Sequence, residues 1–386
     1  MPAVSIQDHI GKFLPLSTVL DKIKQTEPLD TRLITSQNKI KFTFDPIWAM
    51  SLDTIHDDAP VLAQVIIDGE EFPLTKTAAL QAGAAFGIPK ALAKRLPSYL
   101  LEQNLNFWYS AGMEDKSFNL LSIGKDNVIS AFMKPTLKPF SNLGLLDAVL
   151  QGVYELNPDL EVYADWRFNH SLQQTDIRLV FPDASRVLSG PGTAQNDIWS
   201  HGIHITNSLT AAHQTMIDHY FVRWATGAGA TIQLDSTSTW NRKAQGQAEF
   251  ELFTWATQTA KELVEGSGER LDAIQSLVHL DLGSAANASD ILKDINQDYR
   301  VPVAQRQSII ENLAKSEELT MYTVMQSIID VATNPTLPAD RQDSLMRIGG
   351  AIPTSTFDTV KAQVWREGHL ADKTAPNPYE ISNTAA

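Results

Sequence analysis

The chain has 386 residues, of which 43% are hydrophobic and 20% are charged, and this composition is typical of a folded protein. Its net charge of −14 argues against a protein that coats duplex DNA through bulk electrostatics, because such proteins present a basic face. The chain has no cysteine, which excludes disulfides, thiolate catalysis and cysteine-ligated metal centres. It has neither a long apolar run nor a leader-like N-terminus, so we expect a cytoplasmic protein without a membrane segment.

The first half of the chain predicts a mixture of strands and helices. Residues 1–37 are predicted as an N-terminal arm with a short helix. Residues 39–44, KIKFTF, alternate apolar and polar side chains and predict a half-buried strand, and VIIDGEEF predicts a hairpin that turns at its DG pair. Short helices follow: Thr75 is expected to cap the first, and Pro97 to begin the helix of LPSYLLEQNLNFWYS. Two strands around GKDN and the helix LGLLDAVLQGVYEL come next.

From residue 159 onward the sequence is rich in strands. Five segments fit strands by their apolar and β-branched residues, namely EVYADWRF, TDIRLVF, IWSHGIHIT, HQTMIDHYFVRW and GATIQL. A helix with an apolar stripe from Phe250 to Leu263 follows, and the GSG sequence at residues 266–268 stops it. Beyond it we predict four helices, over residues 288–297, 303–315, 319–332 and 339–348.

These elements predict an α+β fold, with a mixed or antiparallel sheet and packed helices followed by an all-helical C-terminal part. The predicted division is an N-terminal arm (1–37), an α+β core domain (38–265), a helical C-terminal part (266–352) and an extended tail (353–386). The C-terminal part is also acidic, so we expect it to be a separable unit packed on the core domain.

Four of the nine histidines lie in the segment IWSHGIHITNSLTAAHQTMIDHYFVRW. Alternation along a strand puts His201 and His204 on opposite faces, and His213 lies six residues from His219, so neither pair can share a metal ion. A hairpin centred on Thr210 would place His201 opposite His219. Two imidazoles are fewer than the three or four ligands that zinc needs. We therefore predict a structural cross-strand pair without a metal.

No other pattern indicates a catalytic or metal site. The HDD sequence at residues 56–58 precedes an alanine and a proline and is typical of a solvated turn. LSGPGTAQND is rich in glycine but lacks the GK[ST] pattern of a phosphate-binding loop, and GxSxG, HExxH and GxGxxG are absent. We assign no catalytic residue, no metal ligand and no cofactor, and we favour a protein that is not an enzyme.

Several segments carry a resemblance to a known family. They are RLPSYLLEQNLNFWY, HITNSLTAAH, the strand ending in WATGA, and LTMYTVMQSIIDVATN with ADRQDSLMRIGGAI. Together they resemble the phage/plasmid-like proteins of uncharacterised function, which phages, prophages and plasmids carry, and the resemblance covers residues 44–352. It implies a protein that works in the cytoplasm of a host cell, and it brings no established activity.

The resemblance also singles out individual positions. Polar residues that recur in the family match Asn104, Asn106, Asn207 and Ser208, and on account of such residues the family has been suspected of being enzymatic. The alternative is a purely structural role: Asn104 and Asn106 would lie on a helix surface, and Asn207 and Ser208 at the end of a hairpin. The chain departs from the family where a TG pair follows Ala225, because the family has Asn-Gly there, often after a cysteine. This departure weakens any role built on those positions.

The order of elements narrows the choice of function. Three consecutive strands, at residues 198–207, 213–224 and 230–234, precede the amphipathic helix and give a β-β-β-α order. This order is similar to the core of single-strand annealing proteins, many of which are encoded by phages. It also occurs in unrelated α+β folds.

Basic residues beside tryptophans are suited to binding single-stranded nucleic acid. Such a site needs aromatic faces on which bases stack and cations that contact phosphates. The loop sequence TWNRK puts Trp240 beside Arg242 and Lys243, and Arg223 and Arg167 each neighbour a tryptophan as well. These five residues form the predicted nucleic-acid site. The alternative is that the tryptophans are buried in the core and the cations are only solvated.

Three hypotheses stand at this point. The first is a phage-type DNA-metabolism protein that binds or anneals single-stranded DNA, for example in recombination, and it implies single-stranded DNA and a homo-oligomer as partners. The second is a non-enzymatic phage structural or partner-binding protein, whose acidic helical part docks the partner. The third is an enzyme acting on nucleotides or nucleic acid, with a site built from His201, His219 and Asn207.

Overall fold

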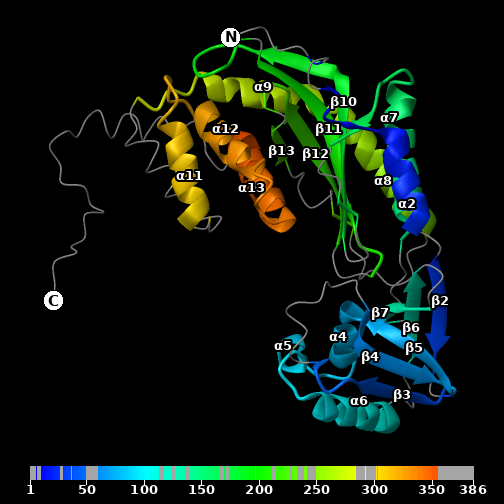
Figure 1. Cartoon of the computed structure of the whole chain (residues 1–386). Helices are drawn as coiled ribbons and strands as arrows, with labels where there is room; N and C mark the ends of the chain where they lie inside the picture. The colour runs from blue at the N-terminus through cyan, green and yellow to red at the C-terminus, as the bar shows by residue number, and fades with distance from the viewer. Residues whose placement is uncertain are drawn as a thin grey trace, which may run out of the picture.

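The computed structural model describes residues 6, 10–26, 29–35, 37–48, 60–112, 117–123, 127–134, 140–165, 169–170, 174–195, 197–210, 214–226, 228–232, 239–240, 249–283, 292, 301 and 303–354. These residues form two lobes, each built around a sheet of its own (Figure 1). None of the helices in these ranges is long and apolar enough to cross a membrane.

The large lobe is centred on an eight-stranded sheet in the order β1-β8-β10-β11-β12-β13, with β9 paired to β10 and β14 paired to β12. All of these pairings are antiparallel. The strands are β1 (Leu14–Pro15), β8 (Tyr163–Ala164), β9 (Asn169–His170), β10 (Thr175–Leu188), β11 (Asp197–Asn207), β12 (Thr215–Arg223), β13 (Ala228–Ile232) and β14 (Thr239–Trp240). Strands β10 to β13 follow one another in the chain and in the sheet, so its centre is a meander.

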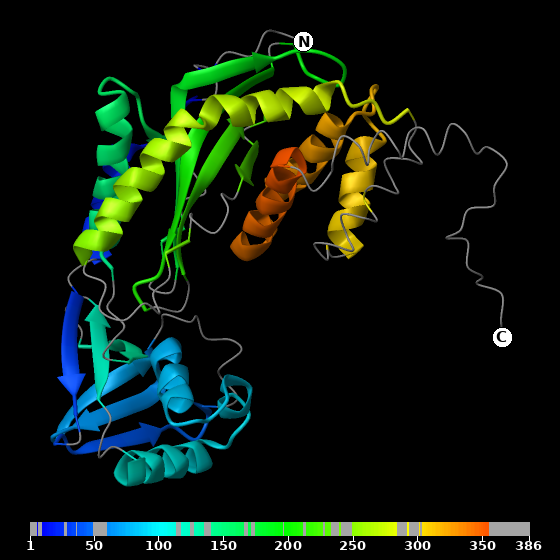
Figure 2. The same ribbon diagram turned by 180° about the vertical axis from the view of Figure 1, so that it is seen from behind.

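Helices cover both faces of this sheet (Figures 1 and 2). Side chains alternate between the faces, so that Leu179 and Ile203 join one core while Val180 and Tyr220 join the other. The first core includes α2 (Leu16–Thr26), α7 (Asn142–Leu156) and α8 (Glu249–Glu265). The second includes α9 (Ser267–Val278), α11 (Val303–Leu313), α12 (Met321–Ala332) and α13 (Ala339–Ala351), which the 3-10 turn η2 (Ile352–Thr354) follows.

Helix α13 approaches the sheet closely at the edge strand β13. A Cβ atom at Gly350 would lie 2.0 Å from the carbonyl oxygen of Thr231, and one at Gly349 would lie 2.4 Å from the side chain of Ile329 in α12. Only glycine fits at such distances, so the GG pair of α13 allows the helix to contact β13 and α12 together.

The small lobe contains a six-stranded sheet in the order β2-β6-β7-β5-β4-β3, which is mixed because β5 and β7 are parallel. Phe86 lies at the centre of its core and contacts the rings of Phe42, Tyr109, Phe118 and Phe132. The elements are β2 (Leu29–Ile34), β3 (Ile40–Phe44), β4 (Pro60–Ile67), β5 (Glu70–Thr75), α4 (Lys76–Ala85), α5 (Lys90–Ala93), α6 (Ser98–Gly112), β6 (Phe118–Ile123) and β7 (Ile129–Met133).

The two lobes meet at the turn after β11. Gln81 of α4 donates to the carbonyl oxygen of Thr210 at 2.9 Å and accepts from the backbone N–H of Phe132 at 2.9 Å. Leu209 is fully buried in a small cluster with Leu121 of β6 and with Ala131 and Met133 of β7. Among the described residues, these contacts connect the hairpin of the large lobe to α4 and to the sheet of the small lobe.

The predicted α+β class is confirmed, with a mixed and an antiparallel sheet and a helical C-terminal region. Several local predictions are confirmed as well. The turn between β4 and β5 has positive φ at Asp68 and Gly69, and Thr75 caps α4 by accepting from the backbone N–H of Ala78. The predicted helix at 288–297 and the tail at 353–386 lie almost wholly outside the described residues.

The course of the chain differs from the predicted division. Residues of the predicted arm (1–37) form β1 and α2 in the large lobe and β2 in the small lobe. The predicted core domain (38–265) contains two sheets with separate cores. At the predicted boundary only Gly266 separates α8 from α9, and α9 packs in the core of the same sheet.

Candidate functional site

The predicted nucleic-acid residues do not form one described surface. The backbone of Trp240 lies in β14, where it pairs with Thr215 at the start of β12. Arg242, Lys243 and Arg167 lie outside the described residues, so their role stays a prediction.

Arg223, the fifth predicted contact, lies inside the large lobe. It is 7% exposed, and its Nε and Nη2 donate to Oδ1 and Oδ2 of Asp197 at 2.7 and 3.0 Å. Burial opposes the charged form, but interactions with Tyr322 and Asp197 outweigh burial and raise the pKa of Arg223. Such a bidentate buried pair is a structural contact between β11 and β12 rather than the open phosphate contact that we predicted. The neighbouring Trp224 is fully buried and donates to Ser200 at 2.6 Å, as the alternative interpretation expects.

The histidine pair is confirmed, although its register differs from the prediction. Nε2 of His201 and Nδ1 of His219 are 3.2 Å apart. The hairpin pairs His201 with Phe221 and Ile203 with His219, so the two histidines are diagonal neighbours across β11 and β12. The turn is therefore centred one residue later than we predicted, which shifts every pairing by two.

The surroundings of the two imidazoles keep them neutral. Phe181 and Phe221 lie against the pair, and both histidines are at most 1% exposed. Burial, with a smaller contribution from the positive charge of Arg270, lowers the pKa of His219 to about 3. Burial and then His219 lower the pKa of His201 well below its ordinary value.

The polar residues that the resemblance singled out have structural partners. Asn106 of α6 accepts from the backbone N–H of Phe42 at 2.8 Å and donates to its carbonyl oxygen at 2.9 Å, so it covers the edge strand β3. Asn104 donates to the carbonyl oxygen of Leu100 in its own helix. Asn207 donates to Asn142 at 2.8 Å.

The enzymatic hypothesis needs His201 and Asn207 to share one site. They lie six residues apart on β11, which separates them by roughly 20 Å along the strand. Asn207 is hydrogen-bonded to α7 and β12, whereas His201 packs against phenylalanines. The structure therefore does not bring this predicted set together.

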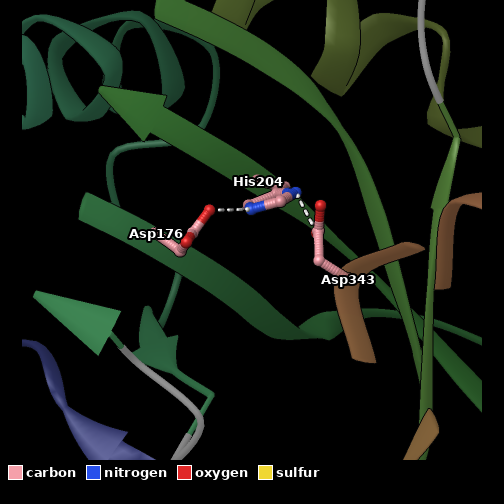
Figure 3. Close-up of side chains that lie close together, drawn as sticks. All are labelled: Asp176, His204 and Asp343. Carbon is pink, nitrogen blue, oxygen red and sulfur yellow. Dashed lines mark hydrogen bonds and ion pairs between the residues drawn. The ribbon is translucent and has the colours of Figure 1, made fainter. Parts of the chain in front are cut away.

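A different group of charged residues gathers around His204, between the sheet and α13 (Figure 3). Nε2 of His204 lies 3.2 Å from Oδ1 of Asp176 on β10, and its Nδ1 lies 3.8 Å from Oδ1 of Asp343 on α13. Thr206 donates to the same oxygen of Asp176 at 3.2 Å. The imidazole thus lies between two carboxylates, and each ring nitrogen faces a different one.

Two arginines and a third carboxylate extend the group. Arg178 of β10 donates to Asp343 at 3.1 Å, and Arg347 of α13 donates to Asp343 at 3.0 Å and to Asp218 of β12 at 2.8 Å. The group then holds two guanidinium groups and three carboxylates around the imidazole of His204. We call these six residues the His204 cluster: Asp176, Arg178, His204, Asp218, Asp343 and Arg347.

The chemistry of the His204 cluster fits an ion network better than a metal site. Ligand atoms of Asp176, His204 and Asp343 lie within 4.8 Å of one another, which would suit one ion. Guanidinium groups already neutralise Asp343, however, and the two carboxylates face opposite nitrogens of the imidazole. Burial raises the pKa of Asp176 and Asp343, but His204, with the arginines, outweighs burial and lowers the pKa of both. The cluster holds α13 on three strands through charge.

Sequence reasoning missed this cluster because its members are far apart in the chain. Two signals were available. The strand TDIRLVF places Asp176 and Arg178 on one face of an otherwise apolar strand, and Asp343 and Arg347 lie four residues apart on a helix. Charges on one face of a central strand require partners from another element.

Comparisons with protein-family models, curated proteins and solved structures found no match to this chain. The resemblance to phage/plasmid-like proteins is therefore still a prediction from the sequence segments quoted above.

Proposed function

We propose that the protein binds single-stranded DNA and serves as a phage-type annealing factor in DNA metabolism. One observation carries the proposal: β11, β12 and β13, the last three strands of the antiparallel meander that begins with β10, are followed by the short strand β14 and then by the long helix α8. Strands β11 to β13 with α8 contain the β-β-β-α order that the sequence predicted, and this order is similar to the core of single-strand annealing proteins.

The position of Trp240 supports the same partner. Strand β14 pairs with Thr215 and Met216, so the backbone of Trp240 is fixed to the first residues of β12. The sequence then continues with Asn-Arg-Lys, and an aromatic ring followed by two cations suits a stacked base with flanking phosphates. Arg242 and Lys243 enter the proposal from the sequence alone.

The charge of the chain sets the conditions for binding. A net charge of −14 repels a polyanion over the range of the Debye length, about 10 Å at 0.1 M salt. We therefore expect binding at low salt, and we expect an oligomer to increase affinity because it lines up several sites.

The test is fluorescence anisotropy with a labelled single-stranded oligonucleotide at two salt concentrations. Trp240→Ala removes a stacking face worth about 1 to 3 kcal/mol and leaves the salt dependence unchanged, while Trp240→Phe keeps most of the affinity. Replacing Arg242 and Lys243 together flattens the slope of log affinity against log salt by up to about 1.4. Lys315→Ala, at an exposed position after α11, is the matched control and leaves binding unchanged. Absence of binding by the wild-type protein at low salt and micromolar concentration contradicts the proposal.

A further inference from the structure

Helix α6 has one face with a structural role. Leu101, Leu105 and Tyr109 are buried in the core of the small lobe. On the same side, Asn106 covers the backbone of Phe42, and Glu102 accepts from the backbone N–H of the next inward-facing residue of β3. The inner face therefore accounts for the contacts between α6 and the lobe.

Outside its inner face, α6 carries three large aromatic side chains in water. Tyr99, Phe107 and Trp108 are 60%, 62% and 48% exposed. The rings of Phe107 and Trp108 contact each other edge-on, with their centroids 5.3 Å apart. Aromatic residues are usually buried, and a group of them on one exposed helix marks an interaction surface. In both views α6 lies on the side of the small lobe that faces away from the large lobe (Figures 1 and 2).

Cations precede the first of these rings in the chain. Lys90 and Arg95 are exposed and Lys94 is half-buried, and all three lie in α5 or in the short connection from α5 to Tyr99 at the start of α6. The segment 86–112 holds three cationic residues against one carboxylate, in a chain whose net charge is −14. The segment that leads into the aromatic face at Tyr99 is thus locally basic.

From this juxtaposition we infer that the α5–α6 face, defined as Lys90, Lys94, Arg95, Tyr99, Phe107 and Trp108, is a docking surface for single-stranded DNA. The inference rests on the proposed function for its partner and adds a second surface to it. Exposed rings stack on unpaired bases, and the lysines and arginine neutralise phosphates. Because bases in a duplex are already stacked on each other, the rings select single strands. Positive charge makes the face complementary to a polyanion.

The rings and the cations make separable contributions, which anisotropy with a labelled single-stranded oligonucleotide can measure on the full chain. Phe107→Ala and Trp108→Ala each weaken binding by about 5-fold to 150-fold, with an unchanged salt slope. Replacing Lys90, Lys94 and Arg95 by glutamine flattens the slope of log affinity against log salt by up to about 2.

The matched control is Phe250→Ala, which removes an exposed phenylalanine from α8 of the large lobe, where the ring is 77% exposed. It leaves binding unchanged. The substituted rings, Lys90 and Arg95 are exposed and Lys94 is half-buried, so circular dichroism and thermal unfolding should match the wild type and show that the variants fold.

Three results overturn the inference, and they are distinguishable. If Trp240→Ala weakens binding while Phe107→Ala and Trp108→Ala do not, the proposed function stands and this face is not part of it. If the wild type binds no single strands, the proposed function fails and the inference fails with it. If the wild type self-associates and the Phe107→Ala/Trp108→Ala double variant becomes monomeric with unchanged DNA binding, the face joins two copies of the chain.

Discussion

Acidification should destabilise the protein through His201 and His219 before its carboxylates begin to titrate. Both imidazoles are buried among phenylalanines, and the pKa of His219 is lowered from 6.5 to about 3. The fold therefore holds the neutral forms, whereas the unfolded chain binds protons once the pH falls below 6.5. Stability from this pair is fully present above pH 6.5 and is lost as the pH falls toward the lowered pKa.

The magnitude follows from linkage. Each buried histidine contributes a limiting loss of about 1.4 kcal/mol per pH unit, so the pair contributes up to about 2.7 kcal/mol per unit. Because each imidazole of the unfolded chain is half protonated at pH 6.5, the loss between pH 6.5 and pH 5 is about 3 kcal/mol. That loss is a large fraction of a typical total stability of about 5 to 15 kcal/mol. Carboxylates of the unfolded chain titrate near pH 4, so they contribute little in this window.

The assay is urea denaturation at several pH values in this window, for the wild type and for His201→Phe and His219→Phe separately. Each variant removes one titrating group from an aromatic environment, so its free energy of unfolding should change less steeply with pH, by about 1.4 kcal/mol per unit. Comparison with the wild type cancels the contribution of every other titrating group. Equal slopes for all three proteins would refute the reasoning.

Two further predictions concern stability. Asn106→Ala leaves backbone groups of the edge strand β3 without their partner and should lower the free energy of unfolding by about 1 to 3 kcal/mol, whereas Asn104→Ala should change it less, and denaturation curves compare the two. Gly350→Ala forces a methyl group against the carbonyl oxygen of Thr231 and should cost at least about 1 to 3 kcal/mol by the same measurement. Gly268→Ala, where a methyl group meets open space, is the control, and equal effects of the two alanines contradict the packing of α13.

Local patterns predicted much of the fold. Alternation identified β3, turn residues identified the β4–β5 hairpin, and helical spacing identified α11, α12 and α13 within a few residues. The conformation of each of these elements depends mainly on residues that are close together in the sequence. The separate small lobe was not predicted, because β2 pairs with β6, which lies about ninety residues later, and no local pattern encodes that pairing.

The same difference between local and long-range contacts decides which contacts of the functional residues could be predicted. The His201–His219 contact was predictable because both residues lie in one hairpin, but its register was not, since a shift of one residue in the turn moves each pairing by two. The His204 cluster depends on α13, which lies more than a hundred residues after β12. Nothing in the sequence indicated that Arg223 is buried, because the carboxylate that pairs with it, Asp197, lies 26 residues earlier in the chain.

Binding of single-stranded DNA by the wild-type protein tests the central claim most directly. A labelled oligonucleotide is titrated with the full chain at low and at moderate salt, once as a single strand and once as the duplex of the same sequence. The proposed function predicts saturable binding of the single strand, weaker binding of the duplex, and a loss of affinity as salt rises. An unchanged anisotropy at micromolar protein and low salt, or equal affinity for both forms, would contradict it.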